Sequence, residues 1–308
     1  MNQIFTVIAP LFLIILTGAV LQRSRAIGDN WQSVLNEYAL KIGFPVLIFT
    51  SLTKAPFSFT EQAPLILSNS AFILILFLTA FAVSKILRLS PRMTRTAFIC
   101  LVFGNVAYLG IPVLVQVTGE HVLPTASLIV AVYLFWNFTV GIAFLDLTRM
   151  ENKKNILKDI AQNLLKNPLL IAVILGMIVA GLNIRLPLMV TAALNMITAS
   201  VTPVVLIVIG LFIGASAFGK ISDWLPVFFF SCLVLIAKPA VLYFGVNLFW
   251  MTPPGEFSSS VIEAAMPMAI TPFALADIYD MNKEFIARGI VLSTILSMVT
   301  LPFWIALI

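Results

Sequence analysis

Charged residues are scarce in this sequence. Only 10% of its 308 residues are Asp, Glu, Lys or Arg, whereas 61% are hydrophobic. A soluble domain has about 25% charged and about 45–50% apolar residues, so this chain has too few charges to cover a surface that faces water. The deficit excludes an ordinary soluble fold. It favours a helical protein embedded in a lipid bilayer, because the apolar runs are continuous and about 20 residues long.

Residues that carry metal or nucleophilic chemistry are also rare. The chain has one histidine, His121, in a predicted short loop, and two cysteines, Cys100 and Cys232, inside apolar segments. One histidine cannot build a metal centre or a His-based catalytic set, and no P-loop is present. We interpret the cysteines as buried thiols. We therefore predict no catalytic residue, no metal and no cofactor.

The sequence is instead rich in long apolar segments. Each is long enough to cross a hydrocarbon core of about 30 Å at about 1.5 Å per residue. The predicted fold is therefore an all-α polytopic membrane protein with ten transmembrane helices. These spans are expected at residues 3–22, 31–53, 63–87, 96–117, 122–147, 168–184, 187–215, 225–250, 260–279 and 284–307.

The basic residues predict the orientation of these spans. Fourteen of the 18 lie in or beside one alternating set of loops, and only Lys54 and Arg185 lie in the other set. Cytoplasmic loops carry such an excess of Lys and Arg, so both termini are expected on the extracytoplasmic side of a plasma (inner) membrane. The net charge of +5 is therefore interpreted as an orientation signal, and no nucleic acid is predicted as a partner.

The two halves of the chain look related. Pro45 in "FPVLIFTSL" matches Pro203 in "TPVVLIVIGL" at an offset of 158, and Pro112 in "YLGIP" matches Pro272 in "MAITP" at an offset of 160. Five spans per half would invert the second half in the membrane, which is typical of secondary transporters. We predict a first repeat at 1–147, a cytoplasmic connector at 148–167 and an inverted second repeat at 168–308.

Two predicted spans carry residues that interrupt helices. The fourth contains Asn105, Gly110 and Pro112, and the ninth contains Pro267 and Pro272. Proline removes a backbone donor and clashes with the preceding turn. The freed backbone groups must be buried in protein or line a watery cavity, because lipid cannot bond them. Paired interruptions of this kind indicate a transporter's substrate site. The alternative is that each proline only kinks a structural helix.

The predicted site would suit an anion. New half-helices are expected to begin near Gly110 and near Pro272, and helix N-termini carry unpaired amides and about half a positive charge. Pro112 and Pro272 suit a first-turn position, where a missing amide costs nothing. Asn105 would donate to a substrate carboxylate or hold the loosened backbone.

Four further polar residues are candidates for this site. Lys238 lies in the middle of a span, so it is expected to face the bundle interior and to balance a substrate carboxylate or pair with Asp277 or Glu263. Glu263 and Asp277 flank the ninth-span interruption and are candidates for proton coupling; the alternative is a solvated position for both. Asn137 either reaches the place where the two interrupted spans cross, called the crossover below, or forms an interhelical hydrogen bond.

The interrupted segments also resemble a known family. "NVAYLGIPVL" and "AAMPMAITPFALADIY" are similar to the fourth and ninth spans of the auxin efflux carrier family. The resemblance implies a fold like that of bile-acid/sodium symporters, with spans 1, 2, 6 and 7 as a scaffold and spans 3–5 and 8–10 as a transport domain. The chain lacks the long central loop of the plant exporters, and it has Gly104 where they have proline, which favours a prokaryotic member.

The resemblance implies a function as well. We predict a secondary transporter of small organic anions, either malate- or malonate-type dicarboxylates or auxin-like monocarboxylates, working by alternating access. A membrane sensor on the same scaffold and an intramembrane enzyme are the alternatives. The expected partners are the organic anion and the lipid bilayer, and a homodimer is left open.

Overall fold

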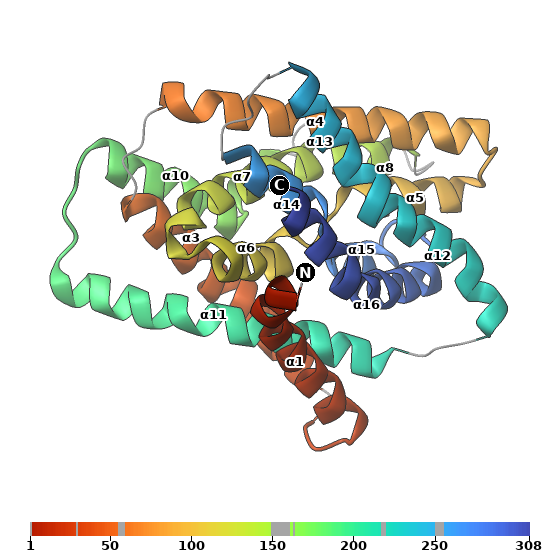
Figure 1. Cartoon of the computed structure of the whole chain (residues 1–308), viewed down its shortest axis with the longest axis horizontal. Coiled ribbons are helices and arrows are strands. Elements are labelled where there is room, and N and C mark those ends of the chain that lie inside the picture. Colours follow the sequence, from red (N-terminus) through yellow and green to blue (C-terminus); the bar gives the residue numbers. More distant parts are fainter. Residues whose placement is uncertain are drawn as a thin grey trace. The chain divides into compact units, whose positions relative to one another are not determined.

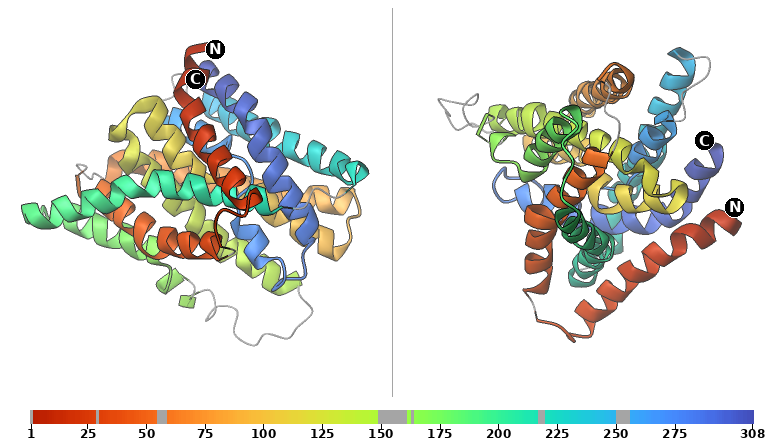
Figure 2. Two further views of the ribbon diagram at one scale, coloured as in Figure 1. Left: turned by 90° about the horizontal axis from the view of Figure 1, so that it is seen from below. Right: turned by 90° about the vertical axis from the view of Figure 1, so that its left-hand side faces the viewer.

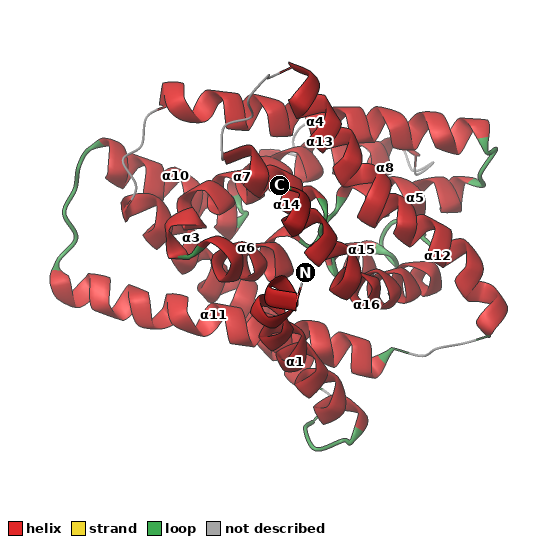
Figure 3. Cartoon of the chain, in the orientation of Figure 1, coloured by secondary structure: helices red, strands yellow, loops and turns green. Residues whose placement is uncertain are grey.

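The computed structural model describes residues 2–28, 30–54, 59–148, 161–162, 164–216, 220–249 and 256–308. Within these ranges the chain is helical, with no strand and a single isolated β-bridge (Figures 1 and 3). The all-α prediction is therefore confirmed for the described part of the chain. Most of the predicted connector at 148–167 lies outside the described residues.

Six helical segments are long and apolar enough to cross a membrane. They are Thr6–Arg23, Gln62–Ile86, Glu120–Thr148, Leu188–Ala215, Ile221–Val246 and Lys283–Leu307, and Val106–Thr118 and Pro168–Gly181 are shorter apolar helices. Because these segments are separate and uncharged for most of their length, the protein is a multi-pass membrane protein. The count of ten spans and their inverted repeat stay predictions.

The helices divide between two compact units, each described here by itself. Unit 1 comprises Met1–Pro64, Ala107–Ala131 and Lys166–Ala215, and unit 2 comprises Leu65–Val106, Val132–Leu165 and Ser216–Ile308. Unit 1 holds predicted spans 1, 2, 6 and 7, and unit 2 holds most of span 3 and spans 8–10. The predicted spans 4 and 5 each have residues in both units, and the scaffold and transport domain stay predictions.

Unit 1 is built mainly from six α-helices and one π-helical segment. Two helices on the boundary, α4 and α7, and the π-helical η2 contribute one end each. The elements of the unit are α1 (Asn2–Arg23), α2 (Trp31–Tyr38), the π-helical η1 (Ala39–Gly43), α3 (Phe44–Lys54), α6 (Ile111–Thr118), the short η3 (Glu120–Val122), α10 (Pro168–Gly181) and α11 (Leu188–Ala215).

Glycines let α1 and α11 pack backbone to backbone (Figure 2). A Cβ atom built on Gly210 would lie 2.0 Å from the carbonyl oxygen of Ile15, and one built on Gly18 would lie 2.5 Å from that of Ile207. Neither position leaves room for a side chain. Small residues at such crossings are how membrane helices approach closely.

Unit 2 contains the two interrupted segments. Its elements are α4 (Phe59–Ile86), α5 (Pro91–Val102), the end of α7 (Leu123–Trp136), the π-helical η4 (Asn137–Gly141), α8 (Ile142–Thr148), η5 (Ile221–Asp223), α12 (Trp224–Cys232), the π-helical η6 (Leu233–Ala237), α13 (Lys238–Phe249), α14 (Glu256–Ala264), α15 (Thr271–Leu275) and α16 (Lys283–Leu307). The π-helical η2 (Val106–Gly110) lies on the boundary of the units.

Aromatic stacking fixes α5 within unit 2. The ring of Phe98 on α5 stacks on Phe144 of α8 with centroids 3.6 Å apart and on Phe77 of α4 at 4.9 Å. Aromatic pairs of this kind add to the burial of their area. The stack holds the start of the first interruption against two neighbouring helices.

Polar side chains are turned inward while many large apolar ones are exposed. Asn69 and Ser260 are fully buried in unit 2, and the Asn69 amide nitrogen donates to the Ser260 hydroxyl at 2.8 Å. Leu188 and Met189, each 85% exposed, and Leu78, 71% exposed, face outward. This distribution is that of helices surrounded by lipid.

Candidate functional site

The first interruption lies between α5 and α6. Helix α5 ends at Val102, the π-helical η2 begins at Val106, and α6 begins at Ile111 with Pro112 in its first turn. The non-helical residues are therefore Phe103, Gly104 and Asn105, so the interruption includes the predicted Asn105 but ends before Gly110 and Pro112. All three are buried.

The second interruption lies between α14 and α15. Helix α14 ends at Ala264 and α15 begins at Thr271, with Pro272 in its first turn. The predicted first-turn position is confirmed for Pro272, whereas the helical segment that holds Pro112 begins earlier, at Val106, because η2 runs directly into α6. Pro267 lies in the middle of the six non-helical residues 265–270 and is buried.

The two interruptions pair with each other inside unit 2. Gly104 and Met268 form an antiparallel bridge. The backbone amide of Asn105 donates to the carbonyl of Pro267 at 2.8 Å, and the amide of Ala269 donates to the carbonyl of Phe103 at 2.9 Å. Backbone groups released from a helix need partners inside a membrane, and here each interruption supplies the partners of the other.

A third helix supplies a hydrogen-bond acceptor for the middle of the second interruption. The backbone amide of Met268 donates to the hydroxyl of Ser293 on α16 at 3.1 Å. The methyl end of Met268 also lies so close to Gly289 that a Cβ atom there would be 2.6 Å from it. Helix α16 therefore fixes the crossover in position through one donor and one close contact.

Lys238 brings a positive charge to the crossover. It begins α13, directly after the π-helical η6, and is 2% exposed. Its ammonium group donates to the carbonyl of Met266 at 3.3 Å. It also lies 3.3 Å from the position that a Cβ atom on Gly104 would take. The Trp304 indole holds η6 by donating to the Leu235 carbonyl at 2.9 Å, and so helps to place Lys238.

Glu263 is the buried negative charge of the same region. It is fully buried in the last turn of α14, and neither carboxylate oxygen has a hydrogen-bond partner among the described residues. Lys238 and Tyr133 lie close enough to interact with it electrostatically. No ion pair within 4.0 Å joins Glu263 to Lys238 in the described part of the chain. An acceptor group with no donor is unusual in a folded interior.

Other buried polar atoms near these elements also lack partners. They are the Asn105 amide nitrogen, the Tyr133 hydroxyl, the Asn137 side-chain oxygen and the Ser231 hydroxyl, judged against the residues that the structure describes. Most buried polar groups in proteins are hydrogen-bonded. Unmatched donors and acceptors are therefore where water or a bound molecule would complete the hydrogen bonding.

The predicted site residues do not all come together. Asn105 meets Pro267 in unit 2, and Lys238 lies beside the same bridge. Gly110 and Pro112 belong to unit 1, so their contribution stays a prediction. Asp277 has a side chain that is 71% exposed and pairs with Lys283, which leaves Glu263 as the carboxylate near Lys238.

Asn137 and Pro272 also lie in unit 2. Asn137 opens the π-helical η4 and is 3% exposed. Its neighbour Phe138 makes an edge contact with Phe103 at 6.3 Å between ring centroids, which brings η4 alongside the first interruption. Pro272 is buried at the start of α15.

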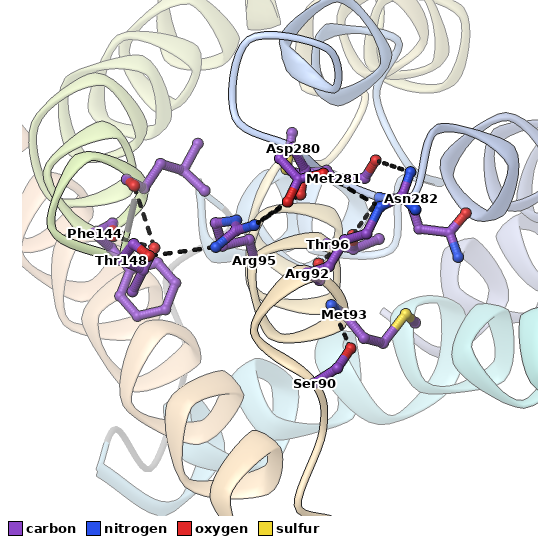
Figure 4. A network of polar contacts seen from close by, with 11 residues as sticks. Ser90, Arg92, Met93, Arg95, Thr96, Phe144, Thr148, Asp280, Met281 and Asn282 are labelled. Atoms are coloured by element: carbon purple, nitrogen blue, oxygen red, sulfur yellow. Dashed lines mark hydrogen bonds and ion pairs between the residues drawn. The ribbon is translucent and has the colours of Figure 1, made fainter. Parts of the chain in front are cut away.

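One polar network, which no sequence pattern indicated, joins these elements (Figure 4). Arg95 on α5 donates to the carboxylate of Asp280 at 2.8 Å, to its carbonyl at 2.9 Å and to the Thr148 carbonyl at 3.3 Å. The Asn282 amide donates to the Thr96 hydroxyl at 2.8 Å. Arg95 is one of the fourteen basic residues in or beside the predicted cytoplasmic loops, and in the structure it joins α5, the end of α8 and the segment after α15.

Metal and thiol chemistry have no candidate centre in the described residues. No group of three or more His, Cys, Asp or Glu side chains there could hold a metal ion. Cys100 is buried, Cys232 is partly buried and both are free.

Comparison with known proteins agrees with the transport interpretation. The model of a family described as "Membrane transport protein" matches residues 3–305. The chain is 22% identical over 97% of its length to a Rhizobium meliloti protein named "Putative malonate transporter", 94% of which is covered. It is 24% identical over 97% of its length to an uncharacterized transporter of Methanocaldococcus jannaschii, 96% of which is covered.

A third relative has a similar name. The chain is 26% identical, over 99% of its length, to an uncharacterized transporter of Methanothermobacter thermautotrophicus, 98% of which is covered. Family and relatives point to a transporter and away from an enzyme. Because the family model spans nearly the whole sequence, the chain belongs to the membrane transport protein family that includes the auxin efflux carriers.

Proposed function

We propose that this protein is a secondary transporter of small organic carboxylates that binds its substrate beside the bridge between Gly104 and Met268. The observation that carries the proposal is the unpartnered amide nitrogen of Asn105, which is buried next to this bridge. Its backbone is fixed by the bond to Pro267, so the side chain is free to donate to a guest. A carboxylate accepts such a bond strongly.

The charges near the bridge favour an anion. The Lys238 ammonium is buried beside Gly104, and the Tyr133 hydroxyl is a further donor without a partner among the described residues. Glu263 offsets part of the positive charge. A site that combines amide donors with a balanced charge pair would bind a carboxylate without holding it too tightly for release.

The relatives support dicarboxylates as the first class to test, because one of them is named for malonate. An anion that crosses alone gains or loses about 2.3 kcal/mol per charge per 100 mV. An inside-negative potential would therefore drive export without a second ion. Alternating access is the proposed mechanism, and the division of the chain into two compact units supports a carrier with two bodies.

The test is uptake into proteoliposomes. Purified protein is reconstituted and challenged with radiolabelled malonate, malate and a monocarboxylate under a set membrane potential. Asn105→Ala should lower uptake roughly 10- to 100-fold, as expected for the loss of a hydrogen bond to a charged group. Its expression and melting temperature should stay close to those of the wild type.

Asn69→Ala is the matched control. Asn69 is also a buried asparagine of unit 2, but its amide nitrogen already donates to Leu65 and Ser260. This variant should lose stability and keep its apparent affinity for the substrate. If Asn105→Ala transports every carboxylate as well as the wild type does, Asn105 is not part of the site and the proposal fails.

A further inference from the structure

The end of α4 carries two positive charges that no carboxylate among the described residues offsets. Lys85 lies in the last turn of α4, Arg88 lies in the turn that follows, and both side chains are exposed. The next two basic residues along the chain differ, because Arg92 and Arg95 both pair with Asp280. The positive charges of Lys85 and Arg88 are therefore unpaired within the described part of the chain.

An exposed apolar surface of α4 leads up to these two charges. Leu78, Ala82 and Ile86 follow one another at four-residue steps and are all exposed, Leu78 by 71% and Ile86 by 77%. Residues at this spacing line one face of a helix. The Lys85 ammonium lies over the Phe81 ring, 5.5 Å from its centroid. The charge of Lys85 therefore lies directly beside the apolar surface, as is usual for lysines at a membrane interface.

Lys85 and Arg88 also arise from one tight turn. The Arg88 backbone amide donates to the Lys85 carbonyl at 3.2 Å, and the Leu89 amide donates to the Ser84 carbonyl at 3.0 Å. Arg88 adopts the left-handed conformation, with a φ of 49°, which is common just after a helix end. Because both side chains leave the chain at this turn, one phosphate group can contact both of them. Arginine binds phosphate through two parallel N–H groups, and lysine binds it as a point charge.

A phospholipid combines the two features that this surface would bind, a phosphate and an apolar chain. Basic residues beside a membrane helix attract anionic headgroups. We infer that Lys85 and Arg88 form a binding site for one anionic phospholipid, with its phosphate at the two cations and an acyl chain along the face that holds Leu78, Ala82 and Ile86. A soluble phosphate ion would leave this apolar face uncovered. The inference does not depend on the proposed function.

Thermal unfolding in detergent tests the inference. Purified full-length protein is melted with added phosphatidylglycerol, with phosphatidylcholine of the same acyl chains, or with inorganic phosphate, all at equal concentration and ionic strength. A ligand that binds the folded state raises the melting temperature. Phosphatidylglycerol should raise the melting temperature of the wild type by about 2–4 °C over phosphatidylcholine. Inorganic phosphate should have no effect, because it lacks the apolar chain.

The variant Lys85→Gln/Arg88→Asn removes both charges from the site. Glutamine keeps most of the length of lysine, and asparagine suits the left-handed backbone at a φ of 49°. Both positions are exposed, so the variant should fold and melt within about 2 °C of the wild type in phosphatidylcholine. It should retain less than half of the shift that phosphatidylglycerol causes in the wild type.

Lys54→Gln/Arg185→Gln is the matched control, because it lowers the net charge by the same amount. Both residues are exposed and belong to unit 1, and Lys54 donates to the uncharged side chain of Asn195. This control should keep the full shift. Native mass spectrometry supplies a second measurement: the wild type and the control should retain one phosphatidylglycerol molecule under conditions that remove it from Lys85→Gln/Arg88→Asn.

Equal melting of the wild type in the two lipids would overturn the inference. So would a full shift in Lys85→Gln/Arg88→Asn, or an equal loss in the control, which would indicate a general effect of net charge. A shift as large with inorganic phosphate would show a site for a soluble anion instead. If the double variant does not fold, the single variants Lys85→Gln and Arg88→Asn decide, because each should lose part of the shift and neither would if the inference is wrong.

Discussion

The guanidinium group of Arg95 bonds Asp280 twice, at the backbone carbonyl and at the carboxylate (Figure 4). Arg95 belongs to α5, which precedes the first interruption, and Asp280 follows α15, which comes after the second. Arg95 also reaches the Thr148 carbonyl at the end of α8. One buried side chain thus joins the elements that flank both interruptions.

Replacement of Arg95 should be far more damaging than replacement of its partner. The Arg95 side chain is 7% exposed and that of Asp280 is 70% exposed. We expect Arg95→Met to lower the free energy of unfolding by about 2–4 kcal/mol, because a buried guanidinium group loses three part-buried hydrogen bonds. Asp280→Asn keeps both carbonyl contacts and suits the left-handed backbone at φ 45°, so it should lose under about 1 kcal/mol. Unfolding in detergent would measure both, and equal losses would contradict the assignment.

Replacement of Ser293 should lower stability and transport more than replacement of a neighbouring serine on α16. Its hydroxyl accepts the Met268 amide, so Ser293→Ala leaves a buried backbone donor without a partner, a loss of about 1–3 kcal/mol. Ser297→Ala is the control, because among the described residues the Ser297 hydroxyl bonds only the Thr294 carbonyl of its own helix. Melting temperature and malonate uptake should both fall for Ser293→Ala and change little for Ser297→Ala. The reverse order would argue against support of the crossover by α16.

The contact between α1 and α11 should not tolerate a methyl group. Gly210→Ala would place a carbon 2.0 Å from the Ile15 carbonyl oxygen, so the helices must separate, with an expected loss of about 1–3 kcal/mol or more. Gly181→Ala is the control, because a Cβ atom there meets nothing within 4 Å. Thermal unfolding monitored by circular dichroism would compare the two. An unchanged melting temperature for Gly210→Ala would show that the helices pack differently.

Much of the fold follows from the sequence because hydrophobic length decides which segments cross a bilayer. The predicted spans at 187–215 and 284–307 correspond closely to α11 and α16. The first-turn position of Pro272 is equally local, because the missing amide of a proline costs nothing at a helix start and α15 begins there. Pro112 instead follows the π-helical η2 within the helical segment Val106–Thr118.

Contacts between residues that lie far apart in the sequence could not be predicted from local patterns. The sequence left Glu263 and Asp277 open as partners of Lys238, and the structure pairs Asp277 with Lys283, six residues later. The bridge between Gly104 and Met268 uses only backbone atoms, which leave no pattern in side chains. Arg95 looked like a loop charge because hydropathy cannot tell a basic residue at a membrane edge from one that is buried between helices.

The bridge also bears on how the protein is made. The backbone amide of Asn105 is synthesised long before the Pro267 carbonyl that accepts its hydrogen bond. During translation the segment around Asn105 therefore enters the membrane with this amide unpaired. Contacts between residues so far apart in the chain form slowly. Nascent chains stalled before Pro267 should therefore depend on the insertion machinery or a chaperone to shield that segment, and the crossover would be among the last parts of the molecule to assemble.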